Sequence, residues 1–234
     1  MAHVEYAVRD QLLNWLCTLA IGSTVCLFLT GVEICWRIRS RGTTDGISPT
    51  PFHTGFISGQ LWLQYGLLRH DEIVISVNSM AALLYSCYLF YYFIMSPYAI
   101  KKCFIRLIFL EMIFLTGVYY YINYYGLPLE IIRSQLGLCC VIFNVLTVAA
   151  PLETLREVFR TRCTETMPLP LCCLTLLVTT EWLLYGILID DIYIKVEFLP
   201  PLNMIRWSLL NGFFAHYLKS NETENHGTKM QYLP

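Results

Sequence analysis

The chain has 234 residues, of which 56% are apolar, 15% aromatic and only 14% charged, whereas an ordinary soluble domain has about 25% charged residues. This composition, with a mean hydropathy of +0.52, excludes a disordered chain, a nucleic-acid-binding protein with a basic surface and most soluble enzymes. The net charge of -1 at pH 7 points to no charged partner. Most of the ten cysteines lie inside apolar runs, which is typical of small core residues rather than a disulfide framework. The composition therefore predicts a polytopic membrane protein.

Seven apolar windows are each long enough to cross a bilayer as a helix, which takes about 20 residues. They cover residues 12–36, 51–68, 73–95, 104–125, 135–155, 168–189 and 192–217. The connections between them are short, so none of them can hold a soluble catalytic domain. The sequence predicts an all-α fold of seven transmembrane helices.

Lysines and arginines beside these windows lie mostly on one side, which the positive-inside rule assigns to the cytosol. They form four groups: Arg37, Arg39 and Arg41; Lys101, Lys102 and Arg106; Arg156, Arg160 and Arg162; Lys219 and Lys229. The opposite side has Arg9, Arg69, Arg133 and Lys195. We therefore expect the N-terminus outside and the C-terminus in the cytosol, with the sequon at Asn221 unglycosylated.

One sequence motif occurs twice at an offset of 120 residues. The pattern W-L-x-Y-G-x-L-x-x-D runs from Trp62 to Asp71 and returns, without a gap, from Trp182 to Asp191. Each copy belongs to a set of three windows, and the window 104–125 lies between the two sets. Because three windows and one linker make an even number, the second set enters the membrane in the same direction as the first.

This arithmetic predicts two parallel three-helix bundles joined by a linker helix, a 3+1+3 arrangement. The expected segments are an extracellular N-terminus (1–11), a first triple-helix repeat (12–97), the linker helix (98–130), a second triple-helix repeat (131–218) and a cytosolic tail (219–234). A pathway at the interface of the two bundles follows from this symmetry.

Together with this arrangement, several short stretches resemble the SWEET sugar transporters of the PQ-loop/MtN3-saliva superfamily, in an animal-like form. They are R-G-T-T-D-G-I-S-P-T-P-F at 41–52, L-W-L-Q-Y-G at 61–66, A-P-L-E-T-L at 150–155 and T-E-T-M-P at 164–168. The resemblance covers residues 12–218. It implies facilitative, bidirectional transport of a mono- or disaccharide by alternating access, with no cofactor and no enzymatic activity.

The resemblance also assigns candidate substrate-binding residues. Asn78 matches the pocket asparagine of the family, and its amide can donate to and accept from sugar hydroxyls. Trp62 and Trp182 match pocket positions, where two large side chains favour a monosaccharide such as glucose. Phe198 stands where the family usually has a second asparagine, and a phenyl ring can stack on a sugar but cannot hydrogen-bond to it. The alternatives are an asparagine bonded to a neighbouring helix and tryptophans of an interfacial aromatic belt.

Four residues at the ends of the repeated motif resemble the outer gate of the family: Tyr65, Tyr185, Asp71 and Asp191. A hydrogen bond from a phenol to a carboxylate is worth about 1.5 to 3 kcal/mol, enough to close a pathway and still let it open. Exposed loop carboxylates are the alternative interpretation.

The family has an inner ring of helix-bending prolines, and Pro51, Pro151 and Pro168 match its positions. Proline bends a helix because it removes one backbone hydrogen bond and clashes with the preceding turn. Gly31 occupies the fourth position, where glycine also permits bending. Ordinary helix-boundary prolines are the alternative for Pro51 and Pro168.

Ionisable residues inside membrane-spanning windows are candidates for function because they are costly in lipid. They are Glu33, His53, Glu111, Glu181 and Arg206. For Glu33 we favour pairing with the neighbouring basic group, whereas Glu181 and Arg206 leave open a coupling of transport to protons.

Two other functions remain as alternatives. Because Phe198 departs from the family pattern, a PQ-loop-like transporter of a non-sugar solute is one. A seven-span receptor is the other, although receptors lack this internal duplication. The expected partners are a small sugar and the lipid bilayer, without nucleic acid or metal. The sequence is compatible with a homo-oligomer, and we expect the plasma membrane as its location.

Overall fold

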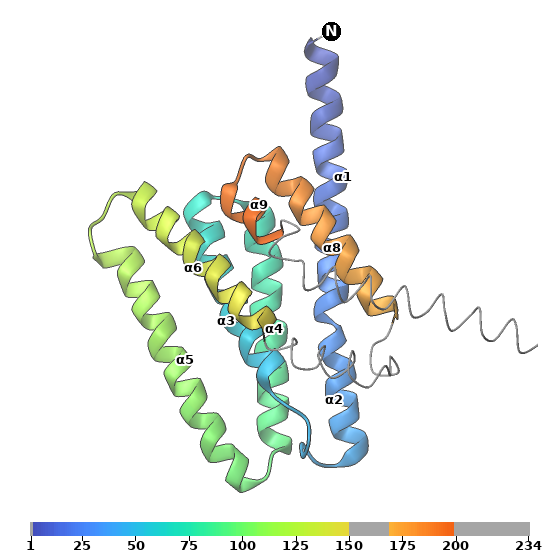
Figure 1. Cartoon of the computed structure of the whole chain (residues 1–234), viewed down its shortest axis with the longest axis vertical. Coiled ribbons are helices and arrows are strands. Elements are labelled where there is room, and N and C mark those ends of the chain that lie inside the picture. Colours follow the sequence, from blue (N-terminus) through green and yellow to red (C-terminus); the bar gives the residue numbers. More distant parts are fainter. Residues whose placement is uncertain (1, 150–168, 199–234) are drawn as a thin grey trace, which may run out of the picture.

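The computed structural model describes residues 2–149 and 169–198, and all regular structure in these two ranges is α-helical (Figure 1). The first span consists of α1 (Ala2–Phe28) and α2 (Thr30–Arg41). It is followed by α3 (Thr50–Arg69), α4 (Glu72–Met95), α5 (Tyr98–Tyr124), α6 (Leu129–Ala149), α8 (Leu169–Leu188) and α9 (Ile192–Phe198). The end of the fifth predicted window and most of the seventh lie outside the described residues.

Two helices begin six residues earlier than their predicted windows. α5 starts at Tyr98 rather than at residue 104, and α6 starts at Leu129 rather than at residue 135. A proline precedes each start: Pro97 is the N-cap of α5, and the carbonyl of Pro128 accepts the first turn's hydrogen bonds in α6. Hydropathy missed these turns because they carry polar and charged residues, which a helix end outside the hydrocarbon tolerates.

The helices differ in how much of their surface faces the protein. By length and composition, three stretches of the described chain can cross a membrane: Gln11–Arg41, Glu72–Met95 and Tyr98–Tyr124. α3 is not among them, and it carries polar residues such as His53, Gln60 and Gln64. α3 buries seven residues, whereas α5 buries only Phe104 and Glu111. α3 is therefore an interior helix, and α5 exposes most of its apolar surface, as a lipid-facing helix does.

Helix packing follows the predicted repeat. In the first half, α4 packs against both α3 and the α1–α2 span, and in the second half α9 packs against both α6 and α8. Across the halves, α1 packs against α8 and α3 packs against α6. Figure 1 shows α5 at the edge of the molecule, where it packs along α3. This arrangement confirms the prediction of two parallel three-helix units joined by a linker helix.

The repeat extends to the detail of the turns between helices. Asp71 and Asp191 each use one carboxylate oxygen to accept hydrogen bonds from the backbone N–H groups two and three residues later, at distances of 2.8 to 3.2 Å. The residues before them, His70 and Asp190, both have a φ of 56°. Because an aspartate cap fixes where a helix starts, the two copies of the motif build the same corner.

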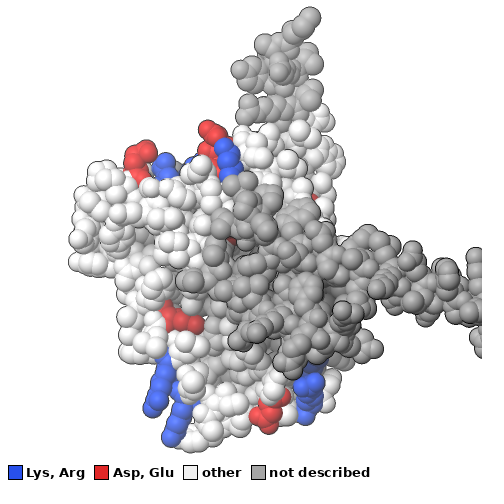
Figure 2. Space-filling view, in the orientation of Figure 1, with Lys and Arg blue, Asp and Glu red and all other residues white. Residues whose placement is uncertain are grey.

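Charged side chains gather at the two ends of the molecule (Figure 2). The described surface between these ends is white in that view, apart from one acidic patch. An uncharged band flanked by charged ends is what a bilayer-spanning protein requires.

Candidate functional site

A cavity of about 300 Å³ lies between the two halves of the bundle, at the lower end of the range for small-molecule sites. Much of its described lining consists of repeat-equivalent pairs, 120 residues apart: Thr24 and Asn144, Ser58 and Val178, Trp62 and Trp182, Val74 and Ile194, Val77 and Glu197, Asn78 and Phe198. The cavity therefore lies on the axis that relates the two repeats. All four predicted substrate-binding residues line it.

The two tryptophans form matching walls of the cavity. Trp62 packs edge-on against Tyr65 at 5.4 Å and 80°, and Trp182 packs against Tyr185 at 5.5 Å and 84°. Each tryptophan is only 6% exposed, which contradicts the alternative of an interfacial aromatic belt. The indole N–H of Trp182 donates to Thr24 Oγ1 at 2.9 Å, whereas that of Trp62 finds no acceptor among the described residues.

Asn78 is held by its own helix. Its Nδ2 donates to the carbonyl oxygen of Val74, in the same helix, at 2.8 Å. The alternative interpretation expected a bond to a neighbouring helix instead. An amide has a second N–H and an acceptor oxygen, and no side chain in the described ranges takes up either group of Asn78. This side chain can serve a ligand hydroxyl in the cavity.

The cavity contains a second polar group that sequence reasoning missed. Ser58 Oγ donates to Asn144 Oδ1 at 2.7 Å, and Asn144 Nδ2 donates to Glu197 Oε1. These bonds join α3, α6 and α9 and fix the orientation of the Asn144 amide. The signal was present in the repeat, because Asn144 lies 120 residues after Thr24, and both are polar residues in apolar runs.

Phe198 lines the cavity at the position equivalent to Asn78 of the first repeat. Its ring stacks on Trp182 with a centroid distance of 6.2 Å and an interplanar angle of 18°. The polar side chain of the second repeat stands one residue earlier, at Glu197. The cavity therefore has polar groups on both sides.

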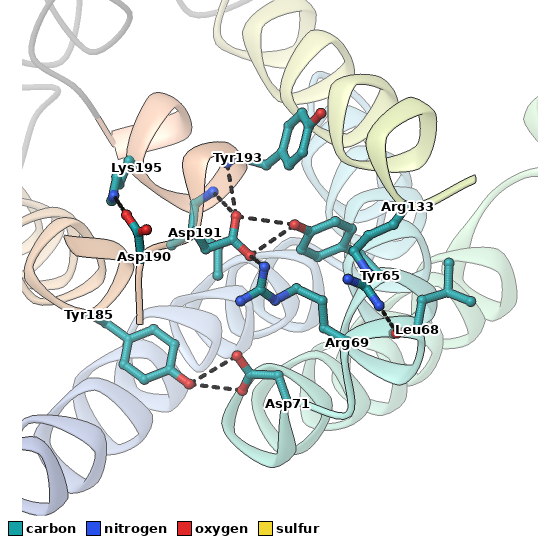
Figure 3. Close-up of polar contacts among 11 residues, drawn as sticks. Tyr65, Leu68, Arg69, Asp71, Arg133, Tyr185, Asp190, Asp191, Tyr193 and Lys195 are labelled. Atoms are coloured by element: carbon teal, nitrogen blue, oxygen red, sulfur yellow. Dashed lines mark hydrogen bonds and ion pairs between the residues drawn. The ribbon is translucent and has the colours of Figure 1, made fainter. Parts of the chain in front are cut away.

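Beyond the tryptophans, four side chains form a layer of hydrogen bonds between the two repeats. Figure 3 shows Tyr65 pointing to Asp191, and Tyr185 pointing to Asp71. Tyr65 Oη donates to the Asp191 carboxylate at 2.8 and 3.1 Å, and Tyr185 Oη donates to Asp71 at 2.8 and 3.0 Å. Each bond crosses from one repeat to the other. The structure thus brings together all four residues expected in an outer gate, and none of the four is an exposed side chain.

One cation makes this layer asymmetric. Arg69 of α3 lies with Nη1 3.0 Å from Asp191 Oδ2, and Asp191 has no exposed surface. The position 120 residues later is Ile189, so the repeat supplies no equivalent of Arg69 to the Tyr185–Asp71 bond. Arg133 of α6 lies nearby and donates to the carbonyl of Leu68 at 3.3 Å (Figure 3).

The neighbouring Asp190–Lys195 pair is of a different kind. The Lys195 ammonium hydrogen-bonds to the carboxylate and lowers the pKa of Asp190. The Asp190 side chain is 92% exposed, and exposed pairs of this kind contribute little to stability. The Asp190–Lys195 pair is therefore not counted with the layer of tyrosine–aspartate hydrogen bonds.

At the other end of the cavity, the first span is interrupted at Leu29, two residues before the predicted bend at Gly31. The phenol of Tyr88 donates to the carbonyl of Phe28 at 3.2 Å beside this interruption. A Cβ on Gly31 would lie 2.4 Å from the Tyr88 ring, so only glycine fits there. The bend depends on close packing of α4 as well as on glycine's freedom.

Of the prolines predicted to bend helices, Pro51 lies in the first turn of α3 and lines the cavity. Pro151 and Pro168 lie outside the described residues, as does Arg206. Glu181 is buried and accepts a hydrogen bond from Ser23 Oγ.

Glu33 lies 3.9 Å from Arg37 on the exposed face of α2, as expected for a pair with the basic group. Among the residues described, no cluster of three His, Cys, Asp or Glu side chains could hold a metal ion.

Comparison with known proteins identifies the family to which the chain is similar. A family model described as "Sugar efflux transporter for intercellular exchange" matches residues 14–99 and 134–207, on either side of α5. Sugar transporter SWEET1 of Caenorhabditis elegans is 36% identical over 76% of this chain and 57% of that protein. Sugar transporter SWEET1 of Drosophila pseudoobscura pseudoobscura is 35% identical over 81% of this chain and 82% of that protein. The human SWEET1 protein is 32% identical over 76% of this chain and 79% of its own length.

A solved structure shares the fold. The 3.7 Å structure of a eukaryotic SWEET transporter superposes with a TM-score of 0.77 and 20% sequence identity, covering 88% of this chain and 99% of that chain. This match confirms the all-helical fold class.

Proposed function

Because the chain belongs to the MtN3/SWEET family of transporters, we propose that it carries a sugar across a membrane in both directions, by alternating access and without an ion gradient. The substrate in this proposal is a monosaccharide such as glucose. Membership of a transporter family confirms that the chain is not an enzyme, and it favours transport over the receptor alternative.

The observation that carries the proposal is the cavity on the repeat axis. Its size, about 300 Å³, suits a small polar molecule. Two tryptophan faces offer apolar surface for the C–H groups of a sugar, and Asn78 offers a donor and an acceptor for its hydroxyls. Binding by this combination is the role that we propose for Trp62, Trp182, Asn78 and Phe198.

In our proposal Asn144 and Glu197 supply the second polar contact, in place of the asparagine that Phe198 replaces. A carboxylate accepts hydrogen bonds from hydroxyls more strongly than a neutral group does. Ser58 and Asn144 hold this carboxylate in place through the hydrogen bonds described above.

Alternating access requires a closed layer on one side while the other side opens. We assign Tyr65, Tyr185, Asp71 and Asp191 to the outer gate, and the hydrogen bonds between the two repeats support this assignment. The inner gate would use the bend near Gly31 and the prolines Pro51, Pro151 and Pro168. The positive-inside rule supports an extracellular outer gate, an external N-terminus and a cytosolic C-terminus, and we propose the plasma membrane as the location. A homo-oligomer is compatible with this mechanism.

Radiolabelled glucose flux in proteoliposomes, without any ion gradient, tests the proposal. The native chain should show saturable uptake and saturable efflux. Asn78→Ala should lower the flux at subsaturating glucose by about tenfold, because loss of a polar contact worth about 1.4 kcal/mol changes affinity tenfold.

Asn123→Ala is a matched control. Asn123 makes the same kind of bond, from Nδ2 to the carbonyl four residues earlier at 2.8 Å, but it lies exposed on α5. Its substitution should leave the flux unchanged. The proposal fails if the native chain carries no glucose, if flux requires an ion gradient, or if both asparagine variants behave alike.

A further inference from the structure

A buried ion-pair geometry lies outside the cavity, between α3 and the linker helix α5. His53 Nδ1 is 2.8 Å from Glu111 Oε1, and each side chain is only 4% exposed. Within the described part of the chain, His53 Nε2 and Glu111 Oε2 are also buried and have no hydrogen-bond partner. Buried polar atoms without partners are rare in folded proteins, and each needs an explanation.

The surroundings of the pair are apolar. The His53 ring lies 4.8 Å from the ring of Phe104, which belongs to an apolar cluster with Phe52, Tyr88 and Tyr92. This cluster and its partly buried neighbours include titratable side chains from two helices. α2 contributes Cys35, and α4 contributes Tyr85, Tyr88, Tyr91 and Tyr92.

In the described ranges, 2–149 and 169–198, the helices around the pair contribute phenols, thiols, lysines and an arginine. α6 meets α3 through a different cluster, whose titratable residues on α6 are Cys139 and Cys140. Besides Glu111, the charged residues of α5 are Lys101 and Lys102, which lie over the rings of Phe93 and Tyr98, and the exposed Arg106. Phenols and thiols ordinarily titrate above pH 8, whereas histidine is the type of side chain that changes charge between pH 5 and 8.

The charge of the pair depends on how many protons it holds. With one proton shared between imidazole and carboxylate the pair is neutral overall. Loss of that proton leaves a carboxylate beside a neutral imidazole, and gain of another leaves an imidazolium beside a carboxylic acid. Either change places one uncompensated charge in an apolar site, which is unfavourable unless the site opens to water.

The position of the pair connects it to the cavity. His53 lies in the first turn of α3, two residues after Pro51, which lines the cavity. Glu111 is one of only two buried residues of α5. The pair therefore holds the start of α3, where the inner gate is proposed, against the outer helix of the bundle.

We propose that His53 and Glu111 form a proton-binding site that positions the start of α3, so that a change in the proton content of the pair changes how readily the inner side of the cavity opens. Proton binding at this site stands independently of the transported molecule. Its effect on flux rests on the proposed function. The site needs no proton gradient, because it responds to pH without moving protons across the membrane.

Two measurements on the purified full-length chain between pH 5 and 8 test this proposal. The first is the melting temperature, and the second is glucose flux with equal pH on both sides of the vesicle membrane. In the native chain both should vary with pH, the flux by about threefold or more across the range in which histidine titrates. The double variant His53→Leu/Glu111→Met should lose both dependences, since apolar replacement of a buried pair is commonly tolerated.

Single and control variants distinguish proton binding from a general loss of structure. Glu111→Gln removes the carboxylate 2.8 Å from His53 Nδ1 and should displace the midpoint of both pH profiles. His70→Asn removes an exposed histidine from the outer turn, where its φ of 56° suits asparagine, and should leave both profiles as in the native chain.

The proposal is overturned if the native melting temperature is independent of pH, or if the double variant keeps the native pH profile. Absence of glucose flux in the native chain would instead contradict the proposed function. The melting profiles would then decide the proton site by themselves.

Discussion

The two hydrogen bonds of the proposed outer gate should differ in strength although their chemistry is the same. Tyr185→Phe removes the bond to Asp71, and no other described side chain of the second repeat bonds to that carboxylate. Tyr65→Phe removes the bond to Asp191, but Arg69 of the same helix still holds Asp191 at 3.0 Å. In Tyr65→Phe, the Arg69–Asp191 ion pair therefore still links α3 to the start of α9. In Tyr185→Phe, the hydrogen bond that links α8 to the start of α4 is lost.

The magnitudes follow from these partners. A hydrogen bond to a charged group contributes about 1.5 to 3 kcal/mol, so Tyr185→Phe should raise the open population about 10- to 150-fold. With the ion pair retained, Tyr65→Phe should cost about 1 kcal/mol and raise that population about fivefold.

Alkylation of buried thiols by a membrane-impermeant maleimide, followed residue by residue with mass spectrometry, measures this opening. Cys17 and Cys140 belong to the same core cluster as the gate tyrosines and are 9% and 1% exposed. If opening and closing are fast, their alkylation rates scale with the open fraction. Reading two cysteines on different helices separates opening of the gate from a local change beside either one.

Tyr92→Phe is the matched control. It removes a buried phenol whose Oη donates to the carbonyl of Ile47 at 2.8 Å, outside the gate, and should leave both alkylation rates unchanged. Equal or larger opening in Tyr65→Phe than in Tyr185→Phe would refute the role assigned to Arg69. Unchanged alkylation in both gate variants would refute the gate itself.

Two further predictions concern packing and orientation. Gly31→Ala should lower the melting temperature by several degrees, because a Cβ there would lie 2.4 Å from the Tyr88 ring and overpacking costs about 1 to 3 kcal/mol. Gly22→Ala is the control. A Cβ on Gly22 would meet nothing within 4 Å, so this substitution should be neutral or slightly stabilising. Asn221 should remain unglycosylated in cells, because the C-terminus is expected in the cytosol. A glycosylated tail, detected as a mobility shift removed by glycosidase, would reverse the proposed orientation.

The four residues of the proposed gate were found through the family resemblance, and both of their bonds join residues of one repeated motif. A motif that occurs twice in parallel units places its copies around a common axis, so Tyr65, Asp71, Tyr185 and Asp191 were expected near one another. Arg69 was not expected in this layer, since nothing at position 189 repeats it. Repeats reveal symmetric contacts, and this ion pair is asymmetric.

The cavity could be predicted only in part. Asn78 and the tryptophans were found through resemblance, but the chain from Ser58 through Asn144 to Glu197 was not. Which residues of α6 and α9 face the axis depends on the rotation of each helix about its own axis. Tertiary packing sets that rotation, and in nearly uniform apolar runs the hydrophobic period carries little information about it.

The shift of the polar residue between the repeats yields a last prediction. The first repeat has Val77 and Asn78 in the cavity, and the second has Glu197 and Phe198 at the equivalent positions. Glu197→Val/Phe198→Asn would give both repeats the same pair. A carboxylate facing the cavity disfavours anionic sugars, because like charges repel strongly away from water.

We expect the native chain to carry glucose and to exclude glucuronate. The double variant should still carry glucose, now with an asparagine from each repeat, and should exclude glucuronate less strongly. The ratio of the two fluxes, measured in one proteoliposome preparation, does not depend on how much protein is correctly inserted. If this ratio is the same in both proteins, Glu197 does not select the charge of the substrate, and the second polar contact must be assigned to Asn144 alone.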